Sequence, residues 1–125
     1  MRPASGACCT AMAAFSLCGC MAPISPDNPV TVRGHPLPPY EVHEECLRLE
    51  QGERVEFAFE STEPVDFNIH YHEGKIVVMP LTRDKSSGDA GVFATPVAQD
   101  YCLMWEAGRA GALLDYRIRL RRAGF

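Results

Sequence analysis

Apolar and polar residues alternate along much of the chain, and the alternation is strictest in Val65–Gly74. The odd positions are apolar: Val65, Phe67, Ile69 and Tyr71. The even positions are polar: Asp66, Asn68, His70 and His72. A period of two residues is that of a β-strand with one buried face. This segment is therefore predicted to be a strand whose second face carries two imidazoles.

The same reading predicts six further strands after residue 39. They are Tyr40–Leu49, Val55–Glu60, Ile76–Met79, Gly91–Thr95, Gln99–Trp105 and Leu113–Arg122. The apolar positions change parity at Cys46–Leu47, which predicts a bulge there. Ile76–Met79 is apolar throughout and is expected to be buried, whereas the polar segment Thr82–Ala90 is expected to be a loop.

About seven short strands separated by turns predict an all-β fold, because no helical period is sustained anywhere. The expected architecture is a small antiparallel β-sandwich or a jelly-roll-like barrel over residues 40–125.

The first residues have a different composition. Residues 1–19 contain one early cation, Arg2, no acidic residue and a run of small apolar side chains, as an export signal does. The run ends in Leu17-Cys18-Gly19-Cys20, which resembles the lipobox of bacterial lipoproteins. The resemblance implies cleavage after Gly19, a lipid on Cys20 and attachment to a membrane. Met21 after that cysteine resembles an outer-membrane address. An ordinary secretory signal or a buried apolar helix are the alternatives.

Residues 20–39 are predicted to be a tether between the membrane and the domain. They contain six prolines: Pro23, Pro26, Pro29, Pro36, Pro38 and Pro39. Proline lacks an amide donor and fixes an extended backbone, so a semi-rigid spacer is expected. His35 in this stretch is expected to be solvated.

The net charge narrows the possible partners. The chain has 12 basic and 16 acidic residues, so without Arg2 the balance is 11 against 16, a net charge of −5. An acidic domain is a poor nucleic-acid binder, and no nucleic-acid partner is expected. The apolar runs after position 20 are too short for a membrane-spanning helix.

Cys46 and Cys102 are the thiols that remain once the signal is removed and Cys20 is lipidated. In an oxidising compartment two such cysteines are expected to form a disulfide. The alternative is two separately buried free thiols.

A family resemblance agrees with this pairing. The segment EECLRLEQGERVEFAFES and the late Tyr101-Cys102-Leu103-Met104-Trp105 are similar to the GOLD-type β-sandwich of secretory-traffic proteins. There a cysteine that opens the domain is matched with one in a terminal strand. The resemblance implies the fold over Tyr40–Leu120 and not the trafficking role.

His70 and His72 are the candidate metal ligands, because two imidazoles at i and i+2 lie about 7 Å apart on one strand face. His43 is expected on a strand near enough to join them, and imidazole suits copper, zinc or nickel. Asp66, Asn68 and Glu73 complete the candidate binding face. Solvent-facing histidines, or a histidine hydrogen-bonded to Asp66, are the alternative. A blue-copper site is excluded because no histidine follows Cys102.

No motif for an enzyme is present: there is no nucleophile elbow, phosphate loop or His-Glu-x-x-His. The sequence therefore predicts a lipid-anchored protein on the periplasmic face of the outer membrane. It is expected to act as a binding or structural module with a protein partner in the envelope. The alternative is a small periplasmic protein that binds copper or zinc through His70 and His72.

Overall fold

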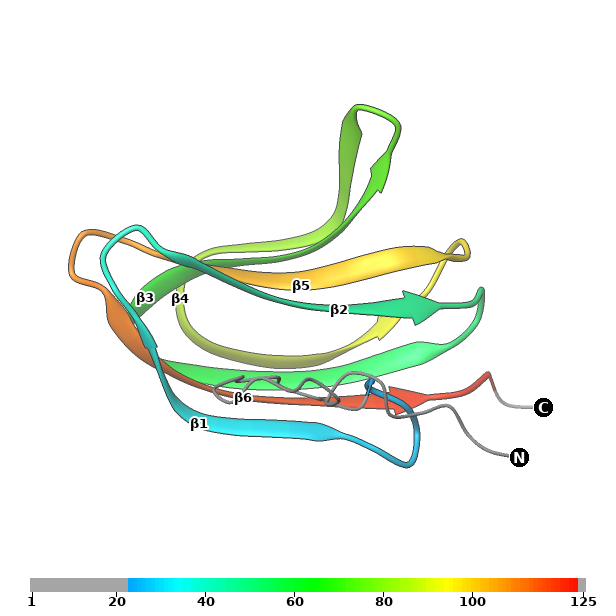
Figure 1. Ribbon diagram of the computed structural model, residues 1–125, viewed down its shortest axis with the longest axis horizontal. Helices are drawn as coiled ribbons and strands as arrows, with labels where there is room; N and C mark the ends of the chain where they lie inside the picture. Colours follow the sequence, from blue (N-terminus) through cyan, green and yellow to red (C-terminus); the bar gives the residue numbers. More distant parts are fainter. Residues whose placement is uncertain (1–22, 124–125) are drawn as a thin grey trace, which may run out of the picture.

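The computed structural model describes residues 23–123, in which all regular secondary structure is β-strand. The six strands are β1 (Val30–Leu37), β2 (Val42–Leu49), β3 (Arg54–Glu73), β4 (Ile76–Ala94), β5 (Gln99–Ala107) and β6 (Ala112–Arg121). The pairings among these strands are antiparallel, in the order β1-β6-β3-β5-β2, and β4 pairs with β3 outside this order. Figure 1 shows a strongly curled sheet that folds over itself.

The long strand β3 produces this curl by changing partner in its middle. Up to Ser61 it pairs with β6, and from Val65 onward it pairs with β5. The ladder to β4 is irregular over the same stretch, between Glu60 and Val65. Pro64 lies at this bend, where a residue without an amide donor is tolerated. One half of β3 therefore belongs to each layer of a small sandwich.

The core fills the space between the two layers. Odd residues of β3 and β5 and even residues of β6 point inward, as their alternation requires. Trp105 is fully buried, with ring centroids 5.3 Å from Phe67 and 4.6 Å from Tyr116. Burial of each such aromatic side chain stabilises the fold by about 1.5–3 kcal/mol. The prediction of an all-β, antiparallel small sandwich is confirmed.

The predicted tether is wrong for Val30–Leu37, which form β1 and pair with β6. Leu37 is part of the core and Val32 packs against it. Apolar residues of β1 therefore still point toward the core although the segment contains a proline. β1 lies at one end of the strand order, and an edge strand tolerates Pro36 because one side makes no ladder hydrogen bonds. A register shift between Val32 and His35 accommodates Gly34, which has a φ of +65°.

The strand count is six rather than about seven because predicted pieces join and β1 is added. The predicted strands Val55–Glu60 and Val65–Gly74 are parts of β3. The expected loop Thr82–Ala90 lies within β4, which pairs only with β3 and therefore has a solvent-exposed edge that suits polar residues. Ile76–Met79 is largely exposed instead of buried.

The predicted bulge in β2 is also wrong. β2 and β5 stay in unbroken register from Val42↔Glu106 to Leu49↔Gln99. The parity change in the sequence arises because Val42 and Cys46 point outward, whereas Leu47 and Leu49 point into the core.

Candidate functional site

Cys46 and Cys102 form a disulfide, as predicted. They are directly opposite each other on β2 and β5, and 56 positions separate them in the sequence. Cys46 is exposed and Cys102 is partly buried, so the bond lies on the outer face of the sheet and is reachable from solvent. The bond therefore links the edge strand β2 to its neighbour β5.

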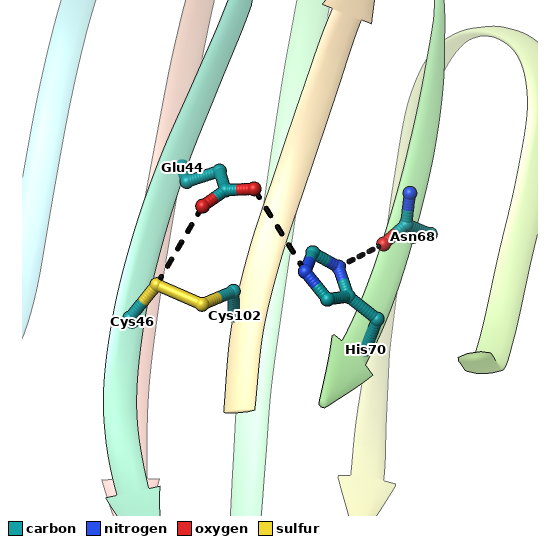
Figure 2. The surroundings of a disulfide bond; sticks show 5 residues. All are labelled: Glu44, Cys46, Asn68, His70 and Cys102. Atoms are coloured by element: carbon teal, nitrogen blue, oxygen red, sulfur yellow. Dashed lines mark hydrogen bonds and ion pairs between the residues drawn. A yellow bond between two sulfur atoms is a disulfide. The ribbon is translucent and has the colours of Figure 1, made fainter. Parts of the chain in front are cut away.

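His70 lies beside this disulfide because β3 is the next strand along. Its register partner on β5 is Cys102, and Figure 2 shows its ring reaching across β5 toward Glu44. The His70 residue is only 4% exposed. Its Nδ1 is 2.7 Å from Asn68 Oδ1, and its Nε2 is 3.8 Å from Glu44 Oε2. Burial lowers the pKa of His70 below its ordinary value, although the Glu44 carboxylate opposes this shift.

The three predicted metal ligands are not brought together. His72 is exposed, with its ring centroid 5.2 Å from that of His70. His43 lies on the opposite face of the sheet, since it pairs with the inward-facing Trp105 while His70 pairs with the outward-facing Cys102. The inclusion of His43 with His70 is therefore wrong.

A different group of metal-ligating side chains converges on the outer face. Within residues 23–123, donor atoms of Glu44, His70 and Cys102 lie within 4.8 Å of one another. Cys102 is oxidised in this structure, however, and a disulfide sulfur is not a thiolate ligand. The sequence analysis did not select Glu44 as a candidate ligand. The available signal was their spacing: Glu44 and Cys46 are two positions apart on one strand, so their side chains share a face.

The remaining residues of the predicted binding face have separate roles. Asp66 is exposed and accepts a hydrogen bond from the Lys85 amide at 2.8 Å, which ties β3 to β4. Asn68 is buried and holds His70. Glu73 is exposed at the end of β3 and pairs with Ile76. These side chains share a strand but do not form one cluster.

A second polar cluster lies on the inner face, between the edges formed by β1 and β2. Tyr116 donates its hydroxyl hydrogen to Glu45 and lies 2.7 Å from Nε2 of His43. Because the Tyr116 hydroxyl donates its hydrogen to Glu45, its oxygen accepts a hydrogen bond from Nε2–H of His43. The ring of His35 packs against that of His43 at a tilt, with centroids 4.0 Å apart, so His35 is packed rather than fully solvated.

Burial and the neighbouring Glu45 raise the pKa of Tyr116, and burial lowers the pKa of His43. Sequence reasoning missed this cluster because the pairing of β1 with β6, which brings His35 inward, was not predicted.

The third feature is the hairpin that connects β3 and β4. Figure 1 shows it, in green, rising away from the rest of the sheet. Its turn is at Gly74, which has a φ of +63°, a conformation that favours glycine. Three apolar side chains beyond the turn are exposed: Ile76 by 63%, Val77 by 44% and Met79 by 48%.

Cys20 and the predicted signal lie outside the described residues, so lipidation stays a prediction. Within the described part of the chain there is no helix long and apolar enough to span a membrane.

The chain matches no protein-family model and no curated protein sequence. Its structure is similar to the crystal structure of Aeromonas hydrophila PliG, a periplasmic lysozyme inhibitor of g-type lysozyme. The TM-score is 0.57 at 12% sequence identity, and the match covers 74% of this chain and 86% of that one. At this level of identity the similarity shows that the two proteins share a fold.

Proposed function

We propose that this chain is a lipid-anchored protein of the bacterial cell envelope that acts by binding another protein through its β3–β4 hairpin. The observation that carries the proposal is the exposed apolar tip of this hairpin, where Val77 and Met79 share one face of β4 and Ile76 lies on the other. Soluble proteins rarely leave neighbouring large apolar side chains exposed on a projecting element, and such patches mark interaction sites.

The conformation of the hairpin is stabilised by the pairing of its two strands and by packing against the core at its base. Its two strands pair through Tyr71↔Val78 and Glu73↔Ile76. At the base, the ring of Tyr71 contacts that of Tyr101 edge-on at 5.1 Å, and Leu81 packs against the core. A preformed hairpin loses little conformational entropy on binding, which favours affinity.

The partner that we propose is a g-type lysozyme. The shared fold with a protein described as an inhibitor of that enzyme supports this choice.

The proposed envelope location rests on the sequence and on the oxidised cysteine pair. Residues 1–19 resemble an export signal, and disulfides persist in oxidising compartments such as the periplasm. Mass spectrometry of the protein isolated from membranes tests the anchor. The expected N-terminal residue is an acylated Cys20, and an unmodified N-terminus contradicts the anchor.

Binding is tested by titrating g-type lysozyme with the disulfide-bonded protein, following both complex formation and muramidase activity. Ile76→Asp places a charge at the proposed contact and is expected to weaken binding by about 30-fold or more, as substitution of a hot-spot residue does. Val92→Asp is the matched control, because Val92 is 58% exposed on the other half of β4. It is expected to bind as the unaltered protein does.

The possible results separate the parts of the proposal. Equal weakening by both substitutions contradicts the hairpin as the interface. Absence of both binding and inhibition contradicts lysozyme as the partner. Inhibition lost only in Ile76→Asp supports both.

A further inference from the structure

The outer face of the sheet gathers four metal-ligating side chains from three adjacent strands. Cys46 on β2 is opposite Cys102 on β5, and Cys102 is opposite His70 on β3. Glu44 precedes Cys46 by two positions and so shares its face. This convergence is independent of the hairpin and of the proposed lysozyme partner.

The spacing of these side chains approaches that of a tetrahedral site. Glu44 Oε2 is 3.8 Å from His70 Nε2, and Glu44 Oε1 is 3.8 Å from Cys46 Sγ. Zinc bonds of about 2.0 Å to nitrogen or oxygen and about 2.3 Å to sulfur place ligand atoms roughly 3.3–3.8 Å apart. The donor atoms of Glu44, His70 and Cys102 all lie within 4.8 Å of one another, so small side-chain rotations bring them to one ion.

Asn68 orients His70 as a metal ligand requires. A carbonyl oxygen only accepts, so the 2.7 Å contact with Asn68 Oδ1 places the ring hydrogen on Nδ1. Nε2 is then left with a free lone pair that faces the Glu44 carboxylate, as Figure 2 shows. Two acceptors facing each other are satisfied by a cation between them. A ligating histidine commonly has such a partner on its other nitrogen.

The disulfide prevents two of the four side chains from binding a metal ion. While Cys46 and Cys102 are bonded to each other, neither sulfur is a thiolate, and only His70 and Glu44 can ligate. Because Cys46 is exposed, an external thiol can reach the bond.

We propose that reduction of the Cys46–Cys102 disulfide opens a zinc site whose ligands are the two thiolates, Nε2 of His70 and the carboxylate of Glu44. A dithiol reductant supplies two electrons and two protons: the protein S–S bond breaks, two thiols form, and the reductant becomes a disulfide. Zn²⁺ then displaces both thiol protons as the two Zn–S bonds form. A mixed set of sulfur, nitrogen and oxygen ligands suits zinc, whereas a carboxylate disfavours Cu(I).

The experiment is calorimetric titration of the whole protein with zinc, oxidised and reduced. Reduction uses a dithiol that is removed anaerobically before the titration. Tight binding of one zinc per reduced chain is expected, with release of protons, and binding to the oxidised protein is expected to be weaker by about 100-fold or more. Cobalt in place of zinc is expected to show thiolate-to-cobalt charge-transfer absorption in the reduced protein alone.

Substitutions identify the ligands. His70→Ala and Glu44→Gln are each expected to weaken zinc binding to the reduced protein by about tenfold or more, and Asn68→Ala by about 10–100-fold. Glu73→Gln is the matched control for Glu44→Gln, because Glu73 is an exposed carboxylate at the end of β3 and lies outside the converging group. It is expected to leave the affinity unchanged.

Every outcome bears on the proposal. Equal affinity in the oxidised protein refutes the gating, and unchanged affinity in His70→Ala and Glu44→Gln refutes the assigned ligands. If the reduced protein loses its near-ultraviolet circular dichroism, zinc is expected to restore it, because metal binding then contributes free energy to folding. Failure of zinc to restore the signal refutes the site.

Discussion

Replacing both Cys46 and Cys102 by serine is expected to remove a large part of the free energy of folding. The bond closes a loop over a separation of 56 residues. In the chain-entropy description, such a closure stabilises the folded state by about 4 kcal/mol at 25 °C. The total stability of a domain of this size is about 5–15 kcal/mol, and a loss of about 4 kcal/mol lowers the midpoint of thermal unfolding by roughly 15–30 °C.

The position of the disulfide also predicts which strand is destabilised most when the bond is removed. β2 pairs with β5 alone and lies at the end of the strand order. We therefore expect the amides of β2 to lose hydrogen-exchange protection before those of β3, which is paired on both sides.

Denaturant unfolding followed by tryptophan fluorescence measures the effect, because Trp105 is buried in the core. The matched control is the unaltered protein after reduction, with a chelator present so that no metal compensates. It is expected to lose the same free energy as the double variant. A loss below about 1 kcal/mol in both refutes the argument from loop closure.

Gly111→Ala is expected to cost about 1–3 kcal/mol, because Gly111 has a φ of +68° and a Cβ there would lie 2.8 Å from the Leu37 carbonyl oxygen. Gly108→Ala, where a Cβ meets nothing within 4 Å, is the control in the same thermal unfolding experiment, and equal losses contradict the steric argument. Tyr116→Phe is expected to cost about 1–3 kcal/mol in denaturant unfolding, because Glu45 loses its hydroxyl donor and His43 its acceptor. Stability is expected to fall as the pH drops below 6.5, because the folded pKa of His70 is lowered and the unfolded chain then binds more protons. His70→Gln should flatten the pH dependence, leaving the part due to His43, whose pKa is also lowered, and an unchanged slope contradicts this assignment.

The strands with clean alternation could be predicted from the sequence because one face of each is buried. Val65, Phe67 and Ile69 are all at most 1% exposed, as their spacing required. The disulfide was equally predictable, since only two cysteines follow Cys20. Predicting these strands and the disulfide requires only the local pattern of apolar residues and the number of cysteines.

The edge strands were harder to predict because half of their backbone faces solvent, which weakens the apolar pattern. β1 carries Pro36 and Gly34 within the strand, and the middle of β4 reads as a polar loop. Both strands form because they pair with β6 and β3, and those pairings are tertiary contacts that no local pattern encodes.

The candidate sites depend on register, which the sequence does not contain. With no bulge in β2, His43 shares the inward face with Leu47 and Leu49, but the expected bulge at Cys46–Leu47 concealed this. His70 meets the disulfide only because β3 and β5 pair His70 with Cys102. A shift of one residue would have turned His70 into the core.

Nuclear magnetic resonance can show whether the β3–β4 hairpin is a protein-binding element. Unlabelled g-type lysozyme is added to the isotope-labelled protein, and backbone amide shifts are followed. We predict that the largest changes fall between Tyr71 and Leu81, around exposed Ile76, Val77 and Met79. Changes confined to other strands, or no changes at saturating lysozyme, would contradict binding through the hairpin.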